Sequence, residues 1–187
     1  MESSRAGSAA GPSPSERIAA AYGLVPLPVE GGRFRRTWAG PPGPDGRPAG
    51  SVILALLTSE PGDFSAMHRL PVDEVWHFYR GDPLEVLLLG PDDAGRSVVL
   101  GGPQEDAAVQ LVVPAGTWMG ARVAPGGTWS LFGTSMAPGF TPASYEGGTA
   151  EELALRYPER APLVRALCRP GAPTTMPADR TGGGLDD

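Results

Sequence analysis

Residues 68–81 read HRLPVDEVWHFYRG, and this stretch contains both a strand pattern and the two histidines of the chain. Its second half, Glu74–Tyr79, has the length and the aromatic content of a β-strand, with a proline before it and a glycine after it. The stretch also contains His68 and His77, the only two histidines of the chain, on either side of an Asp-Glu pair. Imidazole and carboxylate groups are the usual acids, bases and metal ligands of proteins, so this strand is also the first candidate for a functional site.

The same pattern continues along the chain as short apolar runs separated by turns rich in Gly, Pro and Asp. About eight strands at a spacing of about 8–12 residues are typical of an all-β sandwich or barrel, and not of βαβ units. The expected strands are Ser51–Thr58, Phe64–Leu70, Glu74–Tyr79, Leu84–Leu89, Ser97–Leu100, Ala108–Val113, Trp118–Val123 and Thr128–Thr134.

Helices are expected only near the two ends of the chain. The sequence predicts a short helix at Pro14–Tyr22, capped by Ser13 or Ser15 and ended by Gly23. Two more short helices are predicted at Thr149–Tyr157 and Pro158–Cys168, placed so that they close one end of the barrel. The predicted domains are a disordered tail over 1–14, a single domain over 15–169 and a second disordered tail over 170–187.

Composition excludes several classes of function. All 15 basic residues are arginine, and without a lysine the chain has no Schiff-base chemistry and no Walker-type phosphate loop. The net charge of −6 disfavours nucleic acid as a partner. Cys168 is the only cysteine and no apolar run approaches the roughly 20 residues that span a membrane, so we expect a soluble, cytoplasmic protein without disulfides.

Strand alternation limits which side chains can work together. On Glu74–Tyr79 the side chains of Glu74, Trp76 and Phe78 share one face, and those of Val75, His77 and Tyr79 share the other. Glu74 and His77 therefore face the same side only if a bulge intervenes. The bend at Pro71 frees His68 from this constraint and can bring it beside Glu74.

Two motifs carry a family resemblance. The pattern Gly62-x5-His68-x-Leu70-x3-Glu74-x6-Gly81 resembles the first motif of the cupin superfamily, with leucine in place of the second histidine. The pattern Pro114-x-Gly116-x2-Met119 resembles the second motif, with methionine in place of its histidine. Further segments are similar to the Cupin-5 family, and the resemblance covers about residues 15–168; they are EGGRFR at 30–35, FSAMHRL at 64–70, DEVWHFYRGDPL at 73–84, VPAGTW at 113–118 and APGF at 137–140.

The resemblance implies a small cupin-type barrel, that is a double-stranded β-helix or jelly roll, which forms a homodimer and binds a small molecule inside. The usual cupin metal site of three histidines and one glutamate cannot be built from two histidines, so no cofactor is expected. The alternative is an iron, manganese or zinc site of His68, His77 and Glu74 or Asp73, which requires both histidines to point inward.

The function expected from these residues is metal-independent acid–base chemistry on a small molecule. His68 is the expected base, Glu74 its partner and Tyr79 the proton donor, as in the sugar-nucleotide epimerases that this arrangement is similar to. The reaction would be an isomerisation, epimerisation, cyclisation or dehydration, such as occurs in natural-product tailoring. The residues expected to contact the substrate are Trp76, His77, Phe78, Trp118, Met119 and Arg122.

Two other functions fit the same sequence. One is a barrel that binds a small ligand without turnover, and the other is a metal-dependent oxygenase or lyase with a two-histidine, one-carboxylate site. Glu30 precedes a Gly-Gly pair and is interpreted as part of a turn. An exposed edge strand near residues 33–38 offers one route to the homodimer.

Overall fold

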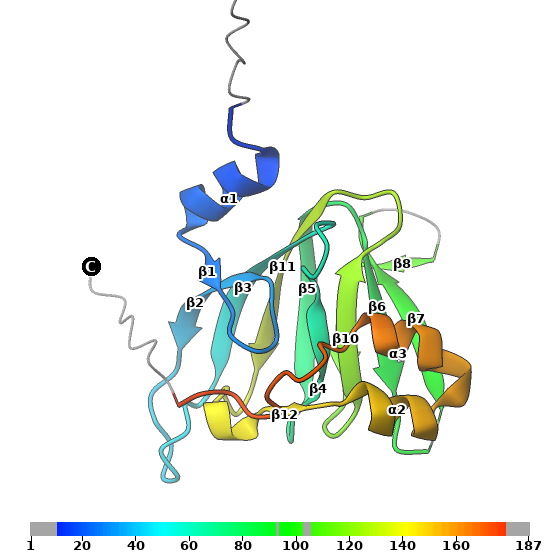
Figure 1. The fold of residues 1–187 in the computed structure, drawn as a ribbon. Helices are drawn as coiled ribbons and strands as arrows, with labels where there is room; N and C mark the ends of the chain where they lie inside the picture. Colours follow the sequence, from blue (N-terminus) through cyan, green and yellow to red (C-terminus); the bar gives the residue numbers. More distant parts are fainter. Residues whose placement is uncertain (1–10, 93, 103–105, 179–187) are drawn as a thin grey trace, which may run out of the picture.

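The structure is a computed structural model that describes residues 11–178 except 93 and 103–105 (Figure 1). Its strands confirm the predicted all-β barrel, and most boundaries fall within one or two residues of the expected ones. In chain order the strands are β1 (Val25–Pro26), β2 (Arg33–Ala39), β3 (Ser51–Thr58), β4 (Ser65–Arg69), β5 (Glu74–Gly81), β6 (Leu84–Leu89), β7 (Gly95–Leu100), β8 (Ala107–Ala108), β9 (Gln110–Val113), β10 (Trp118–Val123), β11 (Trp129–Met136) and β12 (Glu146–Gly147).

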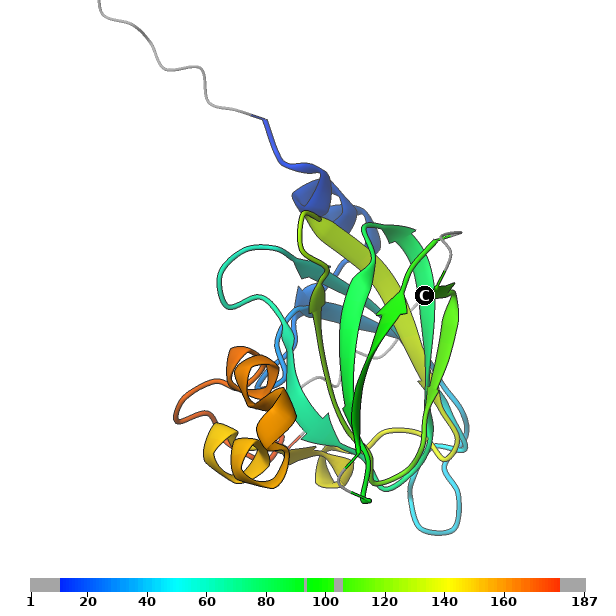
Figure 2. The same ribbon diagram turned by 90° about the vertical axis from the view of Figure 1, so that its right-hand side faces the viewer.

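The strands form two six-stranded sheets that face each other (Figure 2). The first sheet has the order β1-β2-β3-β11-β5-β9 and the second the order β12-β4-β10-β6-β7-β8. Strands far apart in sequence are neighbours in both sheets, and all pairs are antiparallel except β7 with β8. Inward-facing side chains such as Trp76, Leu88, Met119 and Phe132 form the core between the sheets.

The N-terminal helix α1 (Pro14–Tyr22) begins and ends as the sequence predicts. Ser13 and Glu16 form a reciprocal capping box, and Gly23 ends the helix in the left-handed conformation. The helix packs Ala19 against Leu56 and Leu131, which point outward from the first sheet. It therefore covers part of the outer face of that sheet.

The C-terminal helices lie elsewhere than expected. Helices α2 (Ala150–Arg156) and α3 (Ala161–Ala166), joined by the 3-10 turn Pro158–Arg160, do not close an end of the barrel. They pack against the outer face of the second sheet, on Met67 from β4, Leu87 and Leu89 from β6, and Trp118 from β10 (Figure 2). These side chains alternate with inward-facing ones, so the outer face of this sheet is apolar and requires a cover.

Residues 170–178 of the predicted C-terminal tail belong to the described part of the chain. The Gly147 N–H donates a 2.7 Å hydrogen bond to the Thr174 carbonyl, which holds this segment beside β12. The remaining parts of the two predicted tails, 1–10 and 179–187, lie outside the described residues. Among the described helices none is long and apolar enough to span a membrane.

Candidate functional site

A cavity lies inside the barrel, between β3 and β11 of the first sheet and β4 of the second. Its volume is about 60 Å³, which is enough for several waters or part of a small ligand. Most of its wall is apolar, contributed by residues such as Leu27, Phe34, Ile53, Leu70, Phe132, Met136, Phe140 and Met176. The polar residues of the wall are Glu30, Arg33, Ser51, Ser65, His68, Glu74 and Thr134. An apolar cavity with a few converging polar groups is the usual form of a small-molecule site.

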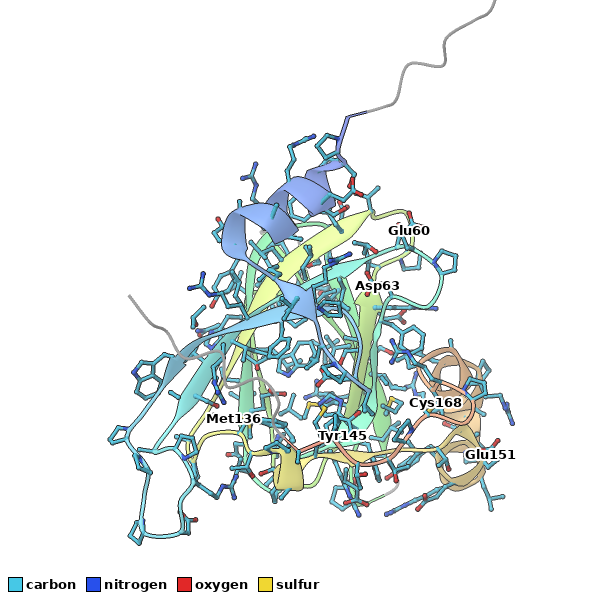
Figure 3. All side chains as sticks on the ribbon, turned by 60° about the vertical axis from the view of Figure 1, so that its left-hand side comes forward. Glu60, Asp63, Met136, Tyr145, Glu151 and Cys168 are labelled. Atoms are coloured by element: carbon cyan, nitrogen blue, oxygen red, sulfur yellow. The ribbon has the colours of Figure 1, made fainter. Side chains whose placement is uncertain are left out.

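His68 is fixed at the cavity by its strand and by two contacts. It lies on β4, opposite Met119 of β10, and is only 2% exposed. Its Nδ1 is 2.7 Å from the carbonyl oxygen of Ala66, and because a carbonyl only accepts, Nδ1 carries a proton and donates. The ring of Tyr145 stacks on the imidazole, with centroids 5.2 Å apart (Figure 3 labels Tyr145). In the neutral ring Nε2 is therefore the nitrogen with the free lone pair.

Glu74 lies at the start of β5 and is buried in the same cavity. Desolvation by burial raises the pKa of this carboxyl group, and the charge of Glu30 raises it further. His68 and hydrogen bonds from Thr134 and Trp76 act in the opposite direction; the Trp76 indole N–H donates to Oε2 over 2.8 Å. Burial dominates, so Glu74 holds its proton more readily than an ordinary glutamate and can serve as an acid.

Glu30 is a third polar residue of the cavity, and the sequence interpretation missed it. Its Oε1 accepts a 2.8 Å hydrogen bond from Ser65 Oγ, and its Oε2 lies 4.0 Å from His68 Nε2. The loop that presents it contains left-handed residues at Val29, Gly31 and Gly32. A carboxylate directly before a Gly-Gly pair was the available signal, but a turn alone explains that pattern equally well.

His77 and Tyr79 do not join this site. With Glu74 and Trp76 facing inward, the next residues of β5 alternate outward, as the strand argument requires. The His77 ring hydrogen-bonds Ser135 Oγ at 2.9 Å and Gln110 Nε2 at 3.0 Å. Tyr79 lies parallel to it and is 50% exposed. The structure thus gives Tyr79 no access to the cavity as a proton donor.

The other expected contact residues also lie off the cavity wall. Trp76, Phe78 and Met119 belong to the core beside it, where Trp76 stacks on the cavity residue Phe132. Trp118 points outward to α2 and α3, under the guanidinium of Arg69. Arg122 is paired with Glu85 at 2.8 Å on the partly exposed surface of the second sheet.

The residues present do not fit the metal site that the cupin resemblance would imply. Of its four positions, His68 and Glu74 retain a donor, Leu70 has none, and Met119 offers a soft thioether that suits hard divalent ions poorly. His77, the only other histidine, lies on the opposite face of its strand from Glu74. In the described part of the chain no group of three or more His, Cys, Asp or Glu is arranged to hold a metal ion.

Comparison with known proteins agrees with this architecture. A family model described as cupin superfamily (DUF985) matches residues 16–147. A solved protein from Shewanella oneidensis is 30% identical, with a TM-score of 0.76 over 83% of this chain and 98% of that one. A hypothetical protein from Leishmania major is 27% identical, with a TM-score of 0.72 over 82% of this chain and 98% of that one.

More distant structures share the fold alone. Oxalate decarboxylase from Bacillus subtilis is 15% identical, with a TM-score of 0.52 over 82% of this chain and 38% of that one. No functionally curated protein has a significantly similar sequence.

Proposed function

The chain belongs to the Cupin-5 family (DUF985) of the cupin superfamily, and from that premise we propose that it is a small-molecule enzyme that transfers protons without a metal ion. The observation that carries the proposal is the 2.7 Å contact of His68 Nδ1 with the Ala66 carbonyl, which leaves Nε2 as the basic nitrogen of the neutral ring at a cavity that also contains Glu74. A base and an acid in one apolar cavity can act on the same bound molecule.

In this proposal His68 Nε2 accepts a proton from a C–H or O–H group of the substrate. Glu74, as the neutral acid, gives its proton to a second substrate atom, such as a carbonyl oxygen that becomes an enol. The two protein groups are then an imidazolium and a carboxylate, and return of one proton to Glu74 and loss of one from His68 restores them. A positioned base of this kind accelerates proton transfer by about 10²–10⁴-fold.

Isomerisation, epimerisation, cyclisation and dehydration all contain such a step. Glu74 takes the role of acid that the sequence assigned to Tyr79, because Glu74 lines the cavity and Tyr79 lies on the outer face. The donor set, in which leucine and methionine replace two of the usual histidines, supports a mechanism without a metal ion.

Proton transfer can be tested before the natural substrate is identified. Small hydroxyketones, including acetoin and hydroxyacetone, are incubated with the protein in D₂O, and NMR follows deuterium incorporation beside the carbonyl. We expect the wild type to accelerate exchange of at least one compound, and H68Q to lose most of that acceleration, about 100-fold. H77Q is the matched control, because it removes the other histidine from the outer face and should exchange like the wild type.

Two results would contradict the proposal. Exchange by H68Q as fast as by the wild type would show that His68 is not the base. Binding of the compounds in the cavity without any exchange would favour the second candidate, a barrel that binds a ligand without turnover, which the largely apolar cavity wall also suits.

A further inference from the structure

The polar end of the cavity presents two neighbouring hydrogen-bond acceptors. The His68 Nε2 lone pair is one, since Nδ1 uses its proton on Ala66. Glu30 Oε2 is another, because Ser65 occupies only Oε1. The two atoms are 4.0 Å apart, too far for a good hydrogen bond with each other. A ligand nitrogen with two N–H groups can donate to both, whereas a ligand hydroxyl, which has one proton, can donate to either of them.

Glu30 is held in this position by its backbone. The Glu30 carbonyl accepts hydrogen bonds from the Ala66 N–H at 2.8 Å and from the Arg169 guanidinium at 2.6 Å. A side chain at Gly31 would collide with the Arg169 guanidinium and with the Phe64 carbonyl, so glycine is required for this approach. The Glu30 carboxylate is therefore a built part of the cavity wall and not a mobile surface group.

The charged groups at the cavity also disfavour an anionic ligand. Glu30 and Glu74 both line this largely apolar cavity, so two carboxyl groups lie in one site. The two terminal NH2 groups of the Arg169 guanidinium donate to the carbonyls of Val29, Glu30, Gly62 and Phe64, so these four N–H groups are already used. Arg33 is the cation that lines the cavity wall, and it is exposed to solvent. A ligand anion placed beside Glu30 would meet like charge at low dielectric.

We propose that Glu30 determines specificity, and that the cavity takes an apolar molecule whose polar end donates hydrogen bonds and carries no negative charge, such as an alcohol or an amine. The apolar part of the ligand would lie along Ile53, Phe132 and Met136. The proposal rests on the proposed function only in placing the ligand in the same cavity. It concerns binding, and holds whether or not His68 transfers a proton.

Three probes of equal carbon skeleton test it: isobutanol, isobutylamine and isobutyrate, titrated into ¹⁵N-labelled protein at neutral pH. We expect the alcohol and the amine to shift the amide signals of the cavity residues. Isobutyrate should bind at least about tenfold more weakly than the amine. In E30Q the difference between amine and carboxylate should fall to about threefold or less. The glutamine side chain can still accept from Ser65 Oγ, so the loop is expected to remain in place.

The matched control is E60Q, which removes one negative charge from an exposed loop toward the other end of the barrel from Met136 and Tyr145 (Figure 3). It should discriminate among the probes like the wild type. Isobutyrate binding as well as isobutylamine would overturn the proposal, as would failure of both donor probes to bind the cavity. If E30Q kept the same difference between amine and carboxylate binding, Glu30 would not determine the specificity of the cavity. Because these probes do not react, each result is separate from the outcome of the exchange experiment.

Discussion

Glu74 combines a buried carboxyl group with a tryptophan N–H donor and a nearby histidine. Because desolvation raises its pKa, the folded protein keeps the Glu74 proton at pH values where the unfolded chain, with an ordinary pKa near 4.5, has lost it. In that range the folded state binds more protons than the unfolded state, so the contribution of Glu74 to stability decreases as pH rises.

The substitution E74Q should remove the decrease in stability that Glu74 causes as pH rises. We expect the stability of the variant relative to the wild type to increase as pH rises above about 4.5, and to be constant below it. The glutamine oxygen can still accept from the Trp76 indole, which limits other effects of the change. Urea unfolding of both proteins across this pH range measures the difference. A difference that does not change with pH would show that burial does not perturb Glu74.

Of the three residues Glu30, His68 and Glu74, two could be predicted from the sequence. His68 and Glu74 were identified from their spacing, and strand alternation already separated Glu74 from His77. Glu30 could not be assigned, because its partner Ser65 is 35 residues away and only the folded loop joins them. Tyr79 was chosen for its chemistry without knowledge of which face of β5 points inward.

The helices α2 and α3 act as the cover of the second sheet. Leu153 on α2 is 1% exposed and packs with Met67, Trp118 and Leu167, whereas Leu155 two residues later is 85% exposed. The substitution L153A should lower the free energy of unfolding by about 2–5 kcal/mol, because it leaves a cavity under the helix. L155A is the control on the same helix and should change stability by about 0.5 kcal/mol or less.

Chemical denaturation of the two variants measures this contrast. Similar stability of L153A and L155A would mean that α2 does not cover the sheet as the structure has it. The existence of these helices was predictable from the spacing of Leu153 and Leu155 and of Leu163, Val164 and Leu167. Their position was not, because Leu87 and Leu89 look like interior residues of a strand until the twist of the barrel fixes which face they occupy.

The inner and outer faces of the two sheets carry different features. The inner faces enclose one cavity with His68, whereas the outer face of the first sheet has α1 at one part and His77 at another. The homodimer stays a prediction. In the expected edge strand, β1 pairs with Arg33 and Phe34, and among the described strands β3 is the one that pairs along the rest of β2.

The most direct test is to determine the tautomer of His68. Both the proposed base and the proposed preference for ligands that donate hydrogen bonds depend on it. Long-range ¹H–¹⁵N NMR of the ring nitrogens is simple here, since the chain has only two histidines and H77Q assigns their signals. In the neutral ring we predict a proton on Nδ1 of His68 and a bare Nε2. A proton on Nε2 would contradict the account, because the cavity would then face a donor instead of a base.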